Sequence, residues 1–256
     1  MWLTTYGKSF VCLKESSHPD QIWFCFHFVG GTASMYFPWA NLLPDGVLLY
    51  AAQLPGRGER IAEPFLQRFA DVIEEYVQLF SGQKISLPFV FFGHSMGGLL
   101  AYEILAKLVT CYNLPQGYLA VSACKPPHRS VKVCKTSQLD DACFIEKIKQ
   151  YGGTPAVILE DQTLLQFFLP RLRADTILLE NYSYQPKQKL PIPILAFGGT
   201  SDKIVTPNDM SDWKEYTNSS FSGKHYPGGH FYLKEAQHQI ISDILQHQAR
   251  LTRSYA

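Results

Sequence analysis

Short apolar runs alternate with amphipathic helical patterns along most of this chain of 256 residues. The runs are nearly continuous, as in strands that helices cover on both faces of a sheet. This alternation predicts an α/β fold with a mostly parallel central sheet. We expect the strands at Ile22–Phe28, Val47–Gln53, Pro88–Phe92, Tyr118–Ala123, Ile192–Phe197 and Phe221–Tyr226.

Three segments between or after these runs have the apolar spacing of a helix with one buried face. In Phe69–Phe80 the apolar side chains follow the helical positions i, i+3, i+4, i+7, i+8 and i+11. The segment Ala101–Leu108 repeats this spacing, and we expect Glu103 and Lys107 to face outward from it. A further helix is expected at Leu233–Ile244.

Residues 126–186 interrupt the alternation. They contain no convincing strand, only helical patterns such as Asp140–Tyr151 and Glu160–Leu169. A helical insertion here predicts a lid over the strand ends, where open α/β sheets bind ligands; helices that merely cover the sheet are the alternative. With 46% hydrophobic and 18% charged residues, residues 1–256 are expected to form a single domain.

Charge and cysteine content exclude several classes of protein. The 23 basic and 22 acidic side chains nearly cancel, which disfavours non-specific nucleic-acid binding. Neither a secretion signal nor a membrane span is expected, because no apolar stretch approaches the roughly 20 residues that cross a bilayer. We therefore expect a cytoplasmic protein with reduced thiols and no metal-binding or redox Cys-x-x-Cys pair. The cysteines are Cys12, Cys25, Cys111, Cys124, Cys134 and Cys143.

The segment Pro88–Gly98 contains the pattern Gly93-x-Ser95-x-Gly97. The pattern alone is weakly specific, but here it follows an apolar run directly and opens a helix directly, as a nucleophile elbow requires. Small neighbours leave room for a sharp turn that raises the serine hydroxyl above the sheet. Ser95 is therefore the predicted nucleophile, and a structural turn serine is the alternative.

A serine nucleophile needs a base that is oriented by a carboxylate, in the chain order serine, acid, histidine. Of the eight histidines, His225 and His230 remain after those that precede the serine, lie in the elbow or in the last helix, or come before the sheet resumes. His225 falls in the last expected strand, whereas His230 lies in the loop after it, from which a side chain can reach over the strand ends. His230 is therefore the predicted base.

The acid is expected in the loop that follows the preceding strand, where Asp202 lies. The loop one strand earlier, Cys124–His128, contains no carboxylate. Asp209 and Asp212 come later and suit helix capping or solvent exposure. We predict that Asp202 fixes the tautomer of His230 and stabilises its imidazolium form without taking the proton.

Two N–H donors should bind the oxyanion that forms during attack on a carbonyl. One is the backbone N–H of Met96, the residue after the nucleophile. The other is expected from the glycine-containing loop after the first expected strand, and we nominate Val29, with Phe28 as the near alternative. Both are main-chain groups, so loop geometry matters more than side-chain identity.

Together these segments resemble the type II thioesterases, which are stand-alone α/β-hydrolases associated with polyketide synthases, nonribosomal peptide synthetases and fatty acid synthases. The resemblance spans most of residues 22–245, and the combination is more specific than any one motif. It rests on Gly93–Gly98 in the elbow, Gln53–Arg60 after the second expected strand, Leu169–Asp175 with Glu180 and Tyr182 in the lid region, Gly198–Asp202, and Gly228–His230.

The resemblance implies hydrolysis of acyl groups from the phosphopantetheine thiol of an acyl or peptidyl carrier protein, without a cofactor or metal. The carrier protein would be a transient partner of the enzyme, which we expect to be a monomer. Thioesterases embedded in synthases commonly carry the acid one strand earlier, so Asp202 favours the stand-alone type. The oxyanion loop departs from the family's usual Pro-His-Ala-Gly-Gly, and its Val29 bears on the size of the adjacent acyl pocket.

Carrier proteins of this kind are usually acidic, which makes the basic stretch Lys125–Lys149 a docking hypothesis; a solvated face is the alternative. Arg57, Arg173 and Asp175 are expected to form structural ion pairs that hold loops and lid. Tyr151 and the pair Phe167–Phe168 are candidates for lining an acyl tunnel or for the core. The basic residues of the docking stretch are Lys125, Arg129, Lys132, Lys135, Lys147 and Lys149.

Two other functions fit parts of this pattern. An esterase or lipase that acts on oxygen esters would use the same three side chains, since the same triad attacks either carbonyl. A non-catalytic binding protein could keep the fold and lose the chemistry. The intact order Ser95, Asp202, His230 argues against the second alternative.

Overall fold

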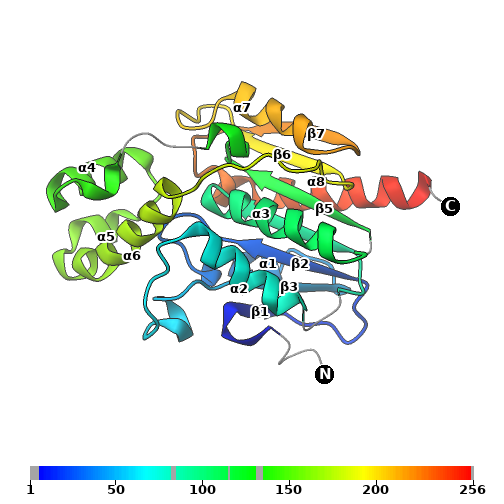
Figure 1. The fold of residues 1–256 in the computed structure, drawn as a ribbon, viewed down its shortest axis with the longest axis horizontal. Helices are drawn as coiled ribbons and strands as arrows, with labels where there is room; N and C mark the ends of the chain where they lie inside the picture. The colour runs from blue at the N-terminus through cyan, green and yellow to red at the C-terminus, as the bar shows by residue number, and fades with distance from the viewer. Residues whose placement is uncertain (1–5, 82–84, 115, 131–134, 255–256) are drawn as a thin grey trace.

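The computed structural model describes residues 6–81, 85–114, 116–130 and 135–254, with side chains to residue 249. Within these residues, strands join in one seven-stranded sheet of order β1-β3-β2-β4-β5-β6-β7 (Figure 1). Strands β2 to β7 pair in parallel, and β1 pairs antiparallel with β3. The strands are β1 (Phe10–Lys14), β2 (Gln21–Phe26), β3 (Val47–Ala52), β4 (Phe89–His94), β5 (Gly117–Ser122), β6 (Ile194–Gly199) and β7 (Phe221–Tyr226).

The six strands expected from the sequence are all present, each with ends within two residues of the expected ones. Strand β1 was not expected. It is an edge strand in which Phe10 is buried and the rest of the strand is partly exposed, so it lacks the continuous apolar run of the central strands. Its backbone pairs with β3 through a register that shifts between Cys12 and Lys14.

Alternate side chains of each central strand enter two separate cores. In β2, Phe24 and Phe26 lie in the core with α2 and α3, whereas Trp23 and Cys25 lie in the core with α1 and α8. The sheet is therefore covered on both faces, as predicted. The helices are α1 (Phe37–Ala40), α2 (Phe69–Ser81), α3 (Met96–Cys111), α4 (Asp141–Tyr151), α5 (Ala156–Glu160), α6 (Gln162–Glu180), α7 (Pro207–Ser211) and α8 (Leu233–Ser254).

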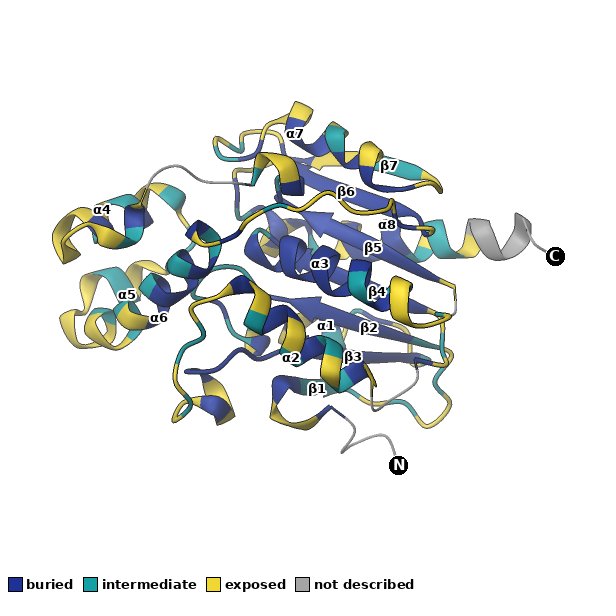
Figure 2. Cartoon of the chain, in the orientation of Figure 1, coloured by how far each residue is buried: buried dark blue, intermediate teal, exposed yellow. Residues whose placement is uncertain are grey.

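Helices α4, α5 and α6 form a group to one side of the sheet (Figure 1). They fall in the segment 126–186 that was expected to be a lid, and we call them the lid helices, or the lid, as a name for their position. Their outer surfaces are largely exposed, in contrast to the buried central strands (Figure 2). The expected helix Glu160–Leu169 is in fact divided at Asp161, whose carboxylate caps α6 by accepting hydrogen bonds from the N–H groups of Thr163 and Leu164. Helix α6 continues through Pro170, so that it begins in the lid and ends against the main core at Leu178.

Five cysteines lie within the described residues and are not paired with one another: Cys12, Cys25, Cys111, Cys124 and Cys143. Cys134 lies outside the described residues, as does Lys132 of the docking stretch. In the described part of the chain, no helix combines the length and the apolar character needed to cross a membrane.

The prediction that Glu103 faces outward is wrong. Its side chain is buried because the chain that leaves α6 crosses over α3 on its way to β6 (Figure 1). The Tyr182 hydroxyl donates a hydrogen bond of 2.6 Å to one Glu103 oxygen, and the Lys187 ammonium pairs with the other. The apolar spacing of α3 does not reveal this, because the covering segment comes from about 80 residues further along the chain.

Replacing Glu103 with alanine should lower the free energy of unfolding by about 3 kcal/mol, because it leaves buried polar groups without their acceptor. Urea denaturation measures this change. The control is Glu74→Ala on α2, which breaks an exposed ion pair with Lys107 and should cost less than about 0.5 kcal/mol. Equal effects of the two substitutions would contradict a structural role for the buried carboxylate.

Candidate active site

Ser95 lies at the sharp turn between β4 and α3. Its backbone has φ 54° and ψ −119°, a positive φ that non-glycine residues adopt only under constraint from the surrounding structure. The Ser95 N–H donates a 2.8 Å hydrogen bond to the carbonyl oxygen of Ser122 on β5, and the Ser95 carbonyl accepts from Gly98 in the first turn of α3. The predicted elbow thus holds its serine by bonds to both neighbouring elements.

Two glycines permit this turn because the backbone crosses itself at close range. A Cβ atom on Gly93 would lie 2.1 Å from the carbonyl oxygen of Gly97, and a Cβ atom on Gly97 would lie 2.1 Å from that of Phe26. Both separations are far below van der Waals contact, and the obstacles are rigid backbone atoms. The spacing Gly-x-Ser-x-Gly is therefore a steric requirement of this turn.

The structure brings Ser95, His230 and Asp202 into one hydrogen-bonded chain. The Nε2 atom of His230 lies 3.0 Å from the Ser95 hydroxyl oxygen, and its Nδ1 atom lies 2.8 Å from Oδ2 of Asp202. His230 sits in the loop between β7 and α8, and Asp202 sits in the loop after β6, where the sequence placed them. A hydrogen bond of 2.8 Å from the Ser201 N–H to the Gly228 carbonyl ties these two loops together.

The Asp202 side chain is fully buried, and both of its carboxylate oxygens accept hydrogen bonds. Its second oxygen accepts hydrogen bonds from the N–H groups of Ile204 at 2.7 Å and Val205 at 3.0 Å. Burial alone would raise the pKa of Asp202, but the hydrogen bond and charge of His230, together with these backbone donors, hold the pKa below its ordinary value. Asp202 is therefore ionised at neutral pH and can orient the imidazole of His230.

A second polar chain lies behind His230 and was not foreseen from the sequence. His94 is completely buried, and its Nδ1 atom lies 2.9 Å from the Ser122 hydroxyl, which lies 2.7 Å from the hydroxyl of Tyr232. Burial, with the neighbouring His230, holds the pKa of His94 well below its ordinary value, so this ring is neutral. These residues come from three separate segments, and no local spacing links them.

The two expected oxyanion donors occupy the same pocket as Ser95. Val29 and Met96 both line it, and among the described residues no acceptor pairs with the N–H group of either. The loop before Val29 is closed by a 2.8 Å hydrogen bond from the Nδ1–H of His27 to the Phe28 carbonyl. Burial and the charge of Arg57 lower the pKa of His27 to about 4, so its ring is neutral and Nδ1 donates.

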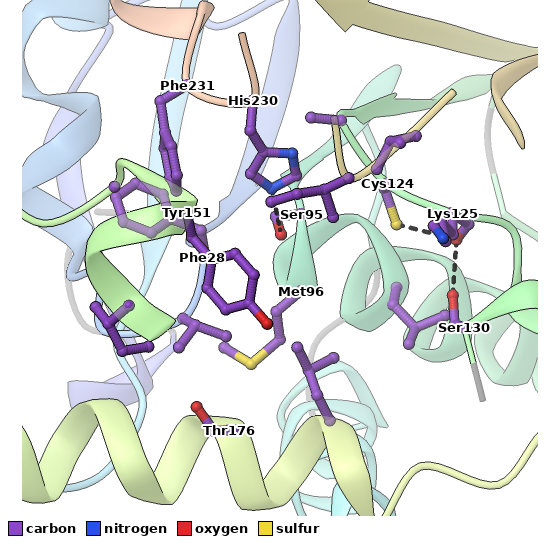
Figure 3. A pocket seen from close by; sticks show the side chains of 18 of the residues that line it. Phe28, Ser95, Met96, Cys124, Lys125, Ser130, Tyr151, Thr176, His230 and Phe231 are labelled. Atoms are coloured by element: carbon purple, nitrogen blue, oxygen red, sulfur yellow. Dashed lines mark hydrogen bonds between the residues drawn. The ribbon is translucent and has the colours of Figure 1, made fainter. Parts of the chain in front are cut away.

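The pocket has a volume of about 290 Å³ and extends from Ser95 to side chains of α4 and α6. Figure 3 shows the rings of Phe28, Tyr151 and Phe231 near His230, and Thr176 of α6 facing them across the pocket. Apolar side chains line much of the pocket, and polar side chains from the segment after β5 line one part of it. Its lining includes Leu99, Ile148, Leu172, Lys125, Arg129 and Ser130.

Cys124 also lines the pocket, but burial raises the pKa of its thiol, which keeps it protonated and disfavours it as a competing nucleophile. Within the described residues, no three His, Cys, Asp or Glu side chains group in a way that could hold a metal ion. The Ser95 hydroxyl, 3.0 Å from Nε2 of His230, is the pocket group best placed for nucleophilic attack.

The other candidate residues from the sequence lie in several different parts of the structure. Arg57 pairs with Asp175, and Arg173 pairs with Asp141, so the expected ion pairs are confirmed. Tyr151 lines the pocket, whereas Phe167 is exposed. Phe168 packs in a small cluster of lid residues, His225 is an exposed residue of β7, and Asp209 completes the capping box of α7.

Replacing Gly97 with alanine should lower the free energy of unfolding by about 3 kcal/mol and displace Ser95, because the new methyl group meets the Phe26 carbonyl. The control Gly223→Ala lies in β7, where the nearest atoms would be 3.6 Å away, and should change stability by less than about 1 kcal/mol. Urea denaturation and labelling of Ser95 by a fluorophosphonate measure the two effects. Wild-type stability and labelling in the Gly97 variant would contradict the steric argument.

Comparison with known proteins identifies the family of this chain. A thioesterase domain family model matches residues 21–247. The gramicidin S biosynthesis protein GrsT of Aneurinibacillus migulanus is 33% identical over 253 residues, which cover 98% of this chain and 97% of that protein.

Two solved structures share the fold over nearly the whole chain. The type II thioesterase BorB from the borrelidin biosynthetic cluster is 30% identical with a TM-score of 0.85, covering 93% of this chain and 96% of BorB. ClbQ from the colibactin NRPS/PKS pathway is 28% identical with a TM-score of 0.85, covering 92% of this chain and 99% of ClbQ. The chain therefore belongs to the thioesterase family, as a type II thioesterase with the α/β-hydrolase fold.

Proposed function

We propose that this enzyme hydrolyses acyl thioesters carried on the phosphopantetheine arm of an acyl or peptidyl carrier protein, with Ser95 as nucleophile, His230 as base and Asp202 as its orienting acid. The observation that carries the proposal is the continuous chain from the Ser95 hydroxyl through both nitrogens of His230 to a buried, ionised carboxylate. The three side chains come from three loops at the C-terminal ends of the parallel strands. Their hydrogen bonds are already formed, so no rearrangement is needed before attack.

In the acylation step, the Ser95 oxygen attacks the thioester carbonyl while its proton passes to Nε2 of His230. The N–H groups of Met96 and Val29 bind the oxyanion of the tetrahedral intermediate; loss of one such donor typically lowers kcat by about 10²–10³-fold. As the carbon–sulfur bond breaks, the thiol leaves and takes the proton from His230. The acyl group remains as an ester on Ser95.

In the second step, water attacks the acyl-enzyme and gives its proton to His230. A second tetrahedral intermediate collapses, the proton returns to the Ser95 oxygen, and the free acid leaves. Asp202 keeps Nδ1 of His230 protonated in both steps, so that Nε2 always faces the serine. The mechanism uses side-chain and backbone groups of this chain and needs no metal or cofactor.

The names of the relatives support a synthase as the source of the substrate. GrsT is named for gramicidin S biosynthesis, and ClbQ for a pathway that contains both synthase types. The pocket suits an acyl group, because Leu99, Ile148 and Leu172 surround it beneath the lid. Release of acyl groups from stalled carrier proteins is the role that we propose.

The function is tested by incubating acyl-loaded carrier proteins with the enzyme and weighing the carrier by mass spectrometry. The wild type should remove the acyl group, and Ser95→Ala should lower the rate by more than about 10³-fold without changing the folded state. Asp209→Asn, at the capping box of α7, is the matched control and should keep its rate.

Two outcomes would overturn parts of the proposal. If the enzyme deacylates no carrier protein but hydrolyses a p-nitrophenyl ester faster than the matched acyl-pantetheine thioester, it is an oxygen esterase. If a fluorophosphonate labels the wild type and Ser95→Ala equally, Ser95 is not the nucleophile.

The docking surface for the carrier protein is proposed on the lid side of the molecule. Of the basic residues in Lys125–Lys149, Arg129 pairs with Asp209 and Asp212, and Lys149 pairs with Glu146, so their charges are already balanced. Lys135 is exposed, with no ion pair among the described residues. It is therefore available to an acidic partner.

Charge reversal in the pair Lys132→Glu and Lys135→Glu should raise KM for an acyl-carrier protein by about tenfold, because rim charges steer association. KM for the same acyl group on free pantetheine should not change. Steady-state kinetics on both substrates measure this, with the double charge reversal Lys8→Glu and Lys189→Glu, at two exposed positions outside the stretch, as the control for net charge. An equal change for both substrates, or none for either, would place docking elsewhere.

A further inference from the structure

Asp175 on α6 and Arg57 after β3 form an ion pair that is buried almost completely, with 1% of each side chain exposed. The pair is bidentate. Nη2 of Arg57 lies 2.7 Å from Oδ1 of Asp175, and Nη1 lies 2.8 Å from Oδ2. The two side chains join elements that are 118 residues apart, the lid helix and the loop behind the oxyanion loop.

The same two side chains also hold the backbone next to Val29. The N–H of Gly30 donates a 2.7 Å hydrogen bond to Oδ2 of Asp175, and Nη1 of Arg57 donates a 3.0 Å hydrogen bond to the Gly31 carbonyl. Each side chain therefore holds one of the two residues that follow the proposed oxyanion donor. Loop position decides whether a main-chain N–H reaches an oxyanion, because the donor must lie about 3 Å from the position of the charged oxygen.

Stability alone does not account for this arrangement. A well-packed apolar pair of similar volume is often as stable as a buried ion pair, or more stable, because desolvation opposes the charge attraction. What an apolar pair could not supply is an acceptor for the Gly30 N–H and a donor for the Gly31 carbonyl. The ion pair thus contributes directional bonds at the oxyanion loop.

We infer that Asp175 and Arg57 are positioning residues that hold the Val29 N–H in the oxyanion hole, so that the lid helix fixes one half of that hole. The inference rests on the proposed function for the identity of the donor. Helix α6 also presents Leu172 and Thr176 to the pocket, so the element that contacts the acyl group also sets the loop that polarises its carbonyl. Asp175 touches no reacting atom and acts only through the Gly30 peptide.

The test compares two double variants, Arg57→Met with Asp175→Asn and Arg57→Met with Asp175→Leu. Both remove the ion pair and both keep a branched side chain of four heavy atoms at position 175, but only asparagine offers an oxygen to the Gly30 N–H. Both variants lose the Arg57 donor to the Gly31 carbonyl, and the leucine variant also loses the acceptor for the Gly30 N–H. We therefore expect kcat to fall by about fivefold in the asparagine variant and by about 30-fold or more in the leucine variant, both at unchanged KM. The control for charge loss in the lid is Asp141→Asn, which breaks the pair with Arg173 and should have no effect.

A second measurement separates positioning from a general loss of structure. An alkyl boronic acid forms a tetrahedral adduct with the serine and depends on the oxyanion hole, whereas a thioether analogue of the substrate depends only on the pocket. The leucine variant should lose boronic acid affinity by the same factor as kcat, and thioether affinity should not change. Both affinities are measured by calorimetry, which does not need the correct carrier protein.

Three results would overturn the inference: both double variants keep wild-type kcat and boronic acid affinity, both lose them equally, or boronic acid and thioether affinities fall together. If a double variant does not fold, the single substitutions Asp175→Asn and Asp175→Ala are compared by the same affinities; alanine removes the acceptor for the Gly30 N–H and should lose boronic acid affinity alone, whereas asparagine should retain it. If no carrier protein is deacylated by the wild type while the boronic acid result holds, the proposed substrate fails and the positioning role stands.

Discussion

The site depends on one geometric constraint: parallel strands end at the same edge of the sheet. Strands β2, β4 and β6 carry Val29, Ser95 and Asp202 in the loops that follow them, and β7 carries His230 in the same way. Each residue is remote from the others in sequence, yet strand pairing brings the four loops together. Parallel pairing therefore brings together residues that are too far apart in the sequence for a short motif to contain them.

Within that frame, the elbow is the position with the least freedom. Three backbone segments approach so closely at Gly93, Gly97 and Phe26 that a single methyl group would separate them. The strained φ of Ser95 persists because the Ser122 carbonyl and the first turn of α3 hold the peptide on both sides. Because its backbone is held in this way, Ser95 presents its hydroxyl to His230 from a fixed position.

The sequence predicted the features whose signal is local. The apolar runs located six strands to within two residues, and the elbow pattern, the Gly-Gly-His loop and the acidic residue after β6 each located one member of the hydrogen-bonded chain. Features that depend on distant partners were missed. Glu103 has the helical position of an exposed residue and is buried by a segment that arrives about 80 residues later, and Ser122 gives no local sign of its contact with His94.

The C-terminal end of the helix expected at Glu160–Leu169 was also misplaced, again because its position depends on distant contacts. The apolar pattern indicated a helix at Glu160–Leu169, and the next residue, Pro170, is of a type that usually stops or kinks a helix. The helix continues because its second half is buried, with Leu178 in the main core and Asp175 bonded to Arg57, and these contacts exceed the local cost of proline.

Tertiary packing therefore makes α6 one rigid element that spans from the exposed lid to the sheet. Because α6 is anchored in the core at one end, it limits the movement of the residues that it contacts along its length. In this protein, α6 contacts both the pocket next to Ser95 and the loop that follows β2, which carries Val29 and Gly30.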